Sequence, residues 1–192
     1  MVTKGTLLML VCFSMVWLAS AQRAVAQEET IVLTANDVTS HASEDAAYGA
    51  YYTLNVGLPT IPEGARLDHA VLEFYVDVAS KTRDEYVNDT PILEVYALTS
   101  AFDGDLNPAE WDTNSTVTRP LLWGEEKHVV MDVTAIIRSF LDNPNRNHGL
   151  VIGSLTGMRE GDFSVRTGRI PGGGVMRIHV YFEPDLSPRG RE

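Results

Sequence analysis

From residue 30 onward, apolar and polar residues alternate with period two in most of the segments that show any regular pattern. Such alternation places the apolar side chains on one face of a β-strand, so it predicts strands with one buried face. The clearest example is the segment 67–78, in which Leu72, Phe74 and Val76 share a face. The segment 175–182 alternates in the same way. These patterns predict a chain that is mostly β.

The exception is a short stretch around residues 133–142. Its apolar residues recur three and four positions apart, the spacing of one helix face. They are Val133, Ile136, Ile137, Phe140 and Leu141. Asp132 or Thr134 can cap the start of this helix, and Asn143-Pro144 ends it. The sequence therefore predicts one helix, with strands at 129–131 and 150–152 on either side.

The other strands and loops follow from the same patterns. Further strands are expected at 30–34, 51–58 and 92–98, with a hairpin of 163–170 and 175–182 that turns at 171–174. Polar segments predict loops at 36–49, 81–91 and 103–120. Many short strands with polar loops and no βαβ alternation indicate an antiparallel, jelly-roll-like β-sandwich. The predicted fold class is all-β, with one short helix at about residues 133–142.

The first 26 residues have the features of a secretory signal peptide. Lys4 precedes a short apolar run at 7–18, and both 19–21 and 24–26 fit the small-x-small rule for cleavage. An uncleaved anchor is the alternative, although the run is shorter than the roughly 20 residues that span a bilayer. We therefore expect a secreted protein, extracellular or periplasmic, with no membrane span after cleavage. Residues 27–184 are predicted to form one domain, and 185–192 a flexible tail.

Charge and cysteine content narrow the classes of function. The formal net charge is −11, so nucleic acid and anionic membranes are poor partners. Cys12 lies in the predicted signal peptide, which leaves the exported domain without a disulfide, a thiolate zinc site or a cysteine nucleophile. The dispersed acidic residues could bind cations, or they could simply keep an exported protein soluble.

Five segments resemble a known family. The run from Ile61 to Val76 (IPEGARLDHAVLEFYV) is followed by Asp132-Val133-Thr134 and then by Asn147-His148-Gly149-Leu150-Val151-Ile152. Together with Ser164-Val165-Arg166 and the closing strand at 177–181, they resemble the bacterial DNRLRE domains, which include carbohydrate-binding module family 96. The resemblance covers about residues 35–183. It implies a secreted, non-catalytic β-sandwich that binds extracellular carbohydrate.

Aromatic residues are the candidate ligand-binding residues. Flat rings on a rigid sheet or loop can cover the apolar face of a sugar, while nearby carboxylates and amides bind its hydroxyl groups. The candidates are Trp111, Trp123, Tyr51 and Tyr86. The alternative is that the tryptophans fill the core, because aromatic residues of β-sandwiches are usually buried.

A structural calcium ion is the candidate cofactor. Asp103, Asp105 and Asn107 place oxygen-bearing side chains at alternate positions, the spacing with which a calcium-binding loop begins. However, Pro108 and Asn114 stand where an EF-hand loop needs glycine and glutamate. An ordinary acidic turn is therefore the alternative.

The sequence indicates binding rather than catalysis. It contains no nucleophile elbow, phosphate-binding glycine loop or zinc-protease motif, and its five histidines show no metal-ligand spacing. The first hypothesis is a carbohydrate-binding module whose partner is a polysaccharide or a cell-surface component. The second is a structural or adhesive extracellular protein that self-associates or binds a cell-surface partner. A glycan-active enzyme is the third.

Overall fold

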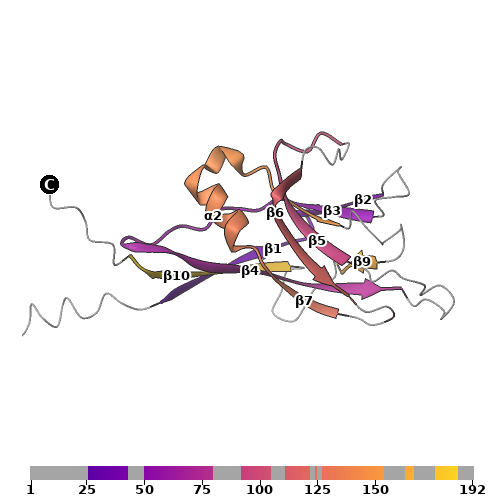
Figure 1. The fold of residues 1–192 in the computed structure, drawn as a ribbon, viewed down its shortest axis with the longest axis horizontal. Helices are drawn as coiled ribbons and strands as arrows, with labels where there is room; N and C mark the ends of the chain where they lie inside the picture. Colours follow the sequence, from indigo (N-terminus) through magenta and orange to yellow (C-terminus); the bar gives the residue numbers. More distant parts are fainter. Residues whose placement is uncertain are drawn as a thin grey trace, which may run out of the picture.

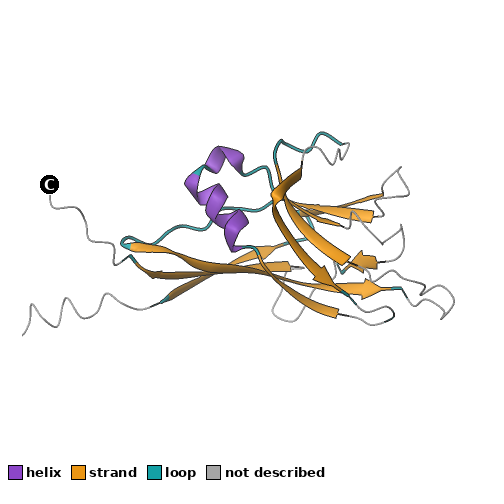
Figure 2. Ribbon diagram, viewed as in Figure 1, coloured by secondary structure: helices purple, strands orange, loops and turns teal. Residues whose placement is uncertain are grey.

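The computed structural model describes residues 26–42, 50–79, 92–104, 111–121, 124, 127–153, 163–166 and 176–185. These residues form two antiparallel sheets packed as a sandwich, together with one short α-helix (Figures 1 and 2). The predicted fold class is therefore confirmed. Residues 1–25 of the predicted signal peptide and residues 186–192 of the predicted tail lie outside the described residues.

Sheet A is built around the longest strand. The strand order is β1-β10-β4-β7, and β9 pairs with the far end of β4 on the side that β10 occupies. The bounds are β1 Gln27–Leu33, β4 Ala65–Val78, β7 Lys127–Asp132, β9 Phe163–Val165 and β10 Met176–Pro184. The inner face of β4 is apolar throughout, because Ala70, Leu72, Phe74 and Val76 all have no exposed surface. The predicted alternation along this strand is confirmed.

Sheet B covers part of sheet A. Its order is β2-β3-β8-β5-β6. The bounds are β2 Val38–Ala42, β3 Ala50–Leu54, β5 Ile92–Leu98, β6 Trp111–Pro120 and β8 Leu150–Gly153. Side chains of Leu54, Val95 and Ile152 point inward and join the same buried core as those of β4. The two sheets therefore share one hydrophobic core.

Several predicted boundaries were wrong. β2 lies inside the predicted loop 36–49 and β6 inside the predicted loop 103–120. Both are edge strands rich in Thr, Ser and Asn, so they lack the apolar alternation that marks a strand. The strand predicted at 51–58 ends at Leu54. The predicted hairpin is also wrong, because β9 pairs with β4 while β10 pairs with β1 and β4; its predicted turn at 171–174 lies outside the described residues.

The predicted helix is confirmed as α2, Thr134–Asp142. Ile136, Ile137 and Phe140 are buried on one face, as the spacing of the apolar residues predicted. A short 3-10 helix, η2 (Pro144–Arg146), follows directly. Figure 1 shows α2 above the inner side of sheet A, next to sheet B. Because β4 is about 46 Å long at 3.3 Å per residue, the helix covers apolar surface that sheet B leaves uncovered.

The start of α2 is attached to β4 by backbone groups. The N-cap position is Val133, with no side-chain cap, so neither Asp132 nor Thr134 caps the helix in the predicted way. Instead, the Asp132 carboxylate accepts a hydrogen bond from the Thr134 amide. The Thr134 hydroxyl accepts the amide of Ala70 at 2.9 Å, and the Val133 amide donates to the Ala70 carbonyl at 2.9 Å. Both backbone groups of a fully buried strand residue are thereby satisfied.

We expect Thr134→Val to lower the free energy of unfolding by about 1–3 kcal/mol, because the buried Ala70 amide loses its acceptor. The substitution keeps the shape of the side chain and removes only the hydroxyl. Urea unfolding measures the effect. Thr134→Ser retains the hydroxyl and serves as the control, so equal loss in both variants would contradict this role.

Gly149 is the position at which a side chain is least tolerated. It has a φ of +99°, and an added Cβ would overlap the carbonyl oxygen of Leu54. Its own carbonyl accepts the amide of Leu98, which fixes the entry into β8. We expect Gly149→Ala to cost about 3 kcal/mol or more, from backbone strain and steric overlap together.

The matched control is Gly57→Ala, because a Cβ at Gly57 meets nothing within 4 Å. Thermal unfolding of both variants by circular dichroism measures the difference. Similar melting temperatures for the two variants would show that the close approach at Gly149 is not a constraint.

Candidate functional site

The outer face of sheet A, which points away from sheet B, carries many polar side chains and several aromatic ones. We define it by the following residues of β1, β10, β4, β7 and the β9 end: Glu28, Thr30, Val32, Arg66, Asp68, His69, Val71, Glu73, Tyr75, Asp77, His128, Val130, Asp132, Ser164, Arg166, Arg177, His179, Tyr181 and Glu183. These residues alternate with the buried ones, so one strand pattern produces both the core and this surface.

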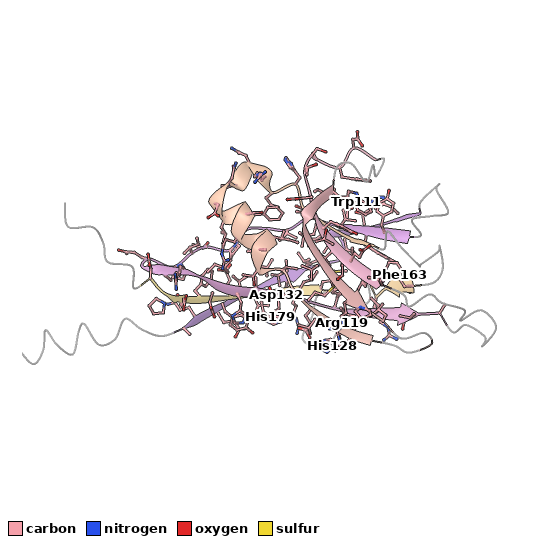
Figure 3. All side chains as sticks on the ribbon, viewed as in Figure 1. Trp111, Arg119, His128, Asp132, Phe163 and His179 are labelled. Carbon is pink, nitrogen blue, oxygen red and sulfur yellow. The ribbon has the colours of Figure 1, made fainter. Side chains whose placement is uncertain are left out.

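A chain of carboxylates and imidazoles crosses all four main strands of this face. Nδ1 of His179 (β10) lies 3.1 Å from Glu28 (β1), and its Nε2 lies 2.9 Å from Oε2 of Glu73 (β4). Oε1 of Glu73 lies 2.7 Å from Nε2 of His128 (β7). Figure 3 shows His179 and His128 on the same side of the molecule. This carboxylate–imidazole chain links neighbouring strands through their side chains.

Glu73 stands at the centre of the chain. The hydrogen bond from His179 is the main cause that lowers the pKa of the Glu73 carboxyl; partial burial opposes it, and His128 adds to the lowering. The side chain is 20 % exposed, so water screens these contacts only in part. Glu73 is therefore ionised in the folded protein well below neutral pH.

Two stacked ring pairs flank the chain. His69 stacks on Tyr181 with ring centroids 4.2 Å apart, and Tyr75 stacks on His128 at 4.8 Å. At the end of β4, Arg166 donates two hydrogen bonds of 2.9 Å to the carboxylate of Asp77. Contacts between rings and between charges thus stabilise the pairing of neighbouring strands on this face.

This arrangement does not amount to a catalytic site. Thr30, His179 and Glu73 follow the order of a hydroxyl, base and acid, with Thr30 Oγ1 3.3 Å from Nδ1 of His179. However, Glu28 lies closer to the same nitrogen, at 3.1 Å. Thr30 is exposed on the outward strand face, so water reaches the hydroxyl that would have to react. The contacts serve to hold the strands and to present charge.

The outer face of sheet B has a different character. Tyr51, Tyr96, Leu98, Trp111 and Val151 point away from the shared core and form a second buried apolar cluster. Tyr96 and Trp111 pack with ring centroids 4.7 Å apart, and His41 stacks on Tyr51 at 4.9 Å. Figure 3 shows Trp111 on the side of the molecule opposite His179. The middle of the outer face of sheet B is therefore buried, while Thr39 and Thr118 on its edge strands are exposed.

The structure brings two predicted ligand residues together but buries them. Trp111 is 4 % and Tyr51 6 % exposed, and both belong to the second cluster. A sugar can stack only on an accessible ring face, so these two rings act as core side chains here. The remaining predicted ligand residues, Trp123 and Tyr86, lie outside the described residues.

The predicted calcium loop is described only in part. Asp103 is exposed, whereas Asp105 and Asn107 lie outside the described residues. Within the described part of the chain, no three His, Cys, Asp or Glu residues are placed to hold a metal ion. Calcium binding at residues 103–107 stays a prediction.

A groove lies between α2 and the beginning of β4. Its volume is about 510 Å³, and its lining includes Ile61, Leu67, Arg138 and Leu141. The ion pair of Arg66 with Glu183, at 2.6 Å, stands at its rim. The groove is thus lined by apolar side chains and by charges of both signs.

The family model of the TGF-beta propeptide matches residues 13–173, which is most of the chain. The chain belongs to the TGF-beta propeptide family. No curated protein matches it. Propeptides of this family are non-catalytic, in agreement with the sequence-based prediction. Proteins of the TGF-beta family are secreted, which agrees with the predicted export. No helix in the described ranges is long and apolar enough to cross a membrane.

The family assignment corrects two predictions. The resemblance to DNRLRE domains and to carbohydrate-binding module family 96 was wrong, and so was the function that it implied, carbohydrate binding. A polysaccharide is therefore not the partner that the family indicates. The matched segments were misleading because they are mostly core and turn residues, such as Leu72 and Gly149, which any antiparallel sandwich of this kind needs. The second hypothesis, an extracellular protein that binds a partner, agrees better with a propeptide.

Sequence reasoning missed the carboxylate–imidazole chain. Its histidines are far apart in the sequence, so spacing alone gave no signal. The one available signal is the outward phase of alternation, which places Glu73, Tyr75 and Asp77 on one face of their strand and Arg177, His179 and Tyr181 on one face of theirs. The register between β10 and β4 was needed to join the two sets.

We expect Glu73→Gln to lower the free energy of unfolding by about 1.5 kcal/mol near pH 6.5, because a charge-assisted hydrogen bond is lost. The folded state lowers the pKa of Glu73, so its contribution is present above the pKa of the unfolded state. That contribution disappears as the pH falls through the folded pKa. The difference between wild type and variant should therefore shrink at acidic pH, as the pH falls through the lowered pKa of Glu73, in urea unfolding.

Glu63→Gln is the matched control, because Glu63 is an exposed carboxylate in the turn before β4. We expect it to change stability little at either pH. A Glu73→Gln difference that stays constant from neutral to acidic pH would contradict the role assigned to the ionised carboxylate.

Proposed function

We propose that this protein acts as a TGF-beta-type prodomain, which binds a mature growth-factor dimer and keeps it latent. The observation that carries this proposal is the match of the TGF-beta propeptide model over residues 13–173. A propeptide acts by covering its partner, so its chemistry is that of a binding surface rather than of a reactive centre.

The described structure supports a binding role. The β-sandwich has an internal core and an accessible sheet face whose strands are joined by side-chain hydrogen bonds. Such a face presents a rigid surface. A rigid surface loses little conformational entropy on association, which favours affinity. The net charge of −11 also favours association with a basic protein.

We further propose that the protein acts outside the cell rather than in a periplasm. The predicted signal peptide directs export, and members of the TGF-beta family act as extracellular proteins.

The test is to mix the purified full-length chain with the mature TGF-beta dimer. We expect a complex in size-exclusion chromatography with light scattering. We also expect a loss of about tenfold or more in receptor-reporter signal when the chain is at about ten times its dissociation constant. An unrelated protein of similar size and negative charge controls for non-specific attraction. No complex and an unchanged signal would overturn the proposal.

A further inference from the structure

We propose that the outer face of sheet A is the surface on which this propeptide binds its growth factor, and that it meets a basic region of that partner. This inference rests on the proposed function and adds to it the location and chemistry of the contact.

The outer face of sheet A is accessible. The outward side chains of His128 and His69 are 47 % and 48 % exposed. The middle of the outer face of sheet B is instead filled by the buried cluster around Tyr96 and Trp111, which are 1 % and 4 % exposed, while Thr39 and Thr118 on its edge strands are exposed. Sheet A therefore presents charged side chains that a partner can reach.

A row of side chains crosses the outer face of sheet A. Val32 pairs with Arg177, Arg177 with Glu73, and Glu73 with Val130, so the four residues lie side by side on neighbouring strands. Val32 and Val130 are 46 % and 41 % exposed, and they are two of the three large hydrophobic residues that the described structure exposes. Exposed apolar side chains that flank a polar centre are typical of a protein interface.

The outer face of sheet A carries a net negative charge. Among the described side chains, six carboxylates face outward from sheet A (Glu28, Asp68, Glu73, Asp77, Asp132 and Glu183) against three guanidinium groups (Arg66, Arg166 and Arg177). The face is therefore −3 when its histidines are neutral. Arg66 pairs with Glu183 and Arg166 with Asp77, and Arg177 lies opposite Glu73 in the strand register. The net negative charge of the face attracts a cationic surface.

The β7 edge of sheet A is partly covered. The Arg119 side chain of β6 donates to the Val130 carbonyl of β7 at 2.7 Å. A carbonyl that already accepts a hydrogen bond is less available to pair with a further strand. This contact favours a partner that binds across the face rather than along β7.

The three exposed hydrophobic residues provide both the test and its control. Val32→Lys and Val130→Lys each replace an apolar contact on the face by a positive charge, at positions exposed enough to preserve folding. Ile61→Lys makes the same change at a residue that is 43 % exposed but lines the groove beside α2. Binding of each variant to the mature TGF-beta dimer is measured by surface plasmon resonance, and the melting temperature of each variant verifies its fold.

We expect Val32→Lys and Val130→Lys each to weaken binding about tenfold, and Ile61→Lys to leave it unchanged. Wild-type affinity should also fall when sodium chloride is raised from about 50 to about 500 mM, because salt screens the charge attraction. If Val32→Lys and Val130→Lys both bind with the wild-type affinity, this inference is overturned and the proposed function stands. A loss confined to Ile61→Lys would do the same, because it would place the contact in the groove. Failure of the wild-type chain to bind would overturn both.

Discussion

Cover for the inner side of β4 is the constraint on which the rest of the architecture depends. This 14-residue strand is apolar along its buried side, and the strands of sheet B that oppose it are shorter. Helix α2 closes the remaining part with Ile136, Ile137 and Phe140. The hydrogen bonds of Val133 and Thr134 to Ala70 set where the helix begins. The length of one strand thus explains why the described residues of a mostly β chain include a helix.

The two sheets bury their surfaces to different extents. Sheet B carries buried apolar side chains on its inner face and a second buried cluster in the middle of its outer face. Sheet A buries apolar side chains on its inner face and presents mainly acids, imidazoles and rings outward, with Val32 and Val130 exposed among them. The proposed binding surface therefore lies on the sheet whose outer side chains are the more polar.

The sequence predicted the sandwich and the helix well because both depend on local periodicity. The helix at 133–142 differs from α2 by one residue at its start. Strands β2 and β6 were missed, since edge strands need no apolar face and Thr39, Ser40 or Thr118 carry no periodic signal. The pairing of β9 and β10 was wrong because nearness in sequence does not decide which strand completes a sheet.

The candidate site was less predictable than the fold. Trp111 and Tyr51 were predicted to bind a ligand because they are aromatic, yet both side chains are buried. The histidines of sheet A had no local pattern, and they meet Glu73 only because β10 and β7 pair with β4 on opposite sides. Resemblance at core positions pointed to the wrong family, because many sandwiches share the same packing requirements.

The amino-acid sequence by itself determined which side chains of each strand face inward, where the helix lies, and the negative charge of the whole. These properties are local or additive, so neighbouring residues suffice to fix them. Only the tertiary structure decided which strands lie side by side, and therefore which charges meet. Strand order and register depend on contacts between residues far apart in the sequence, such as Glu73 and His179, which are more than 100 positions apart. Local sequence patterns do not specify which distant residues pair.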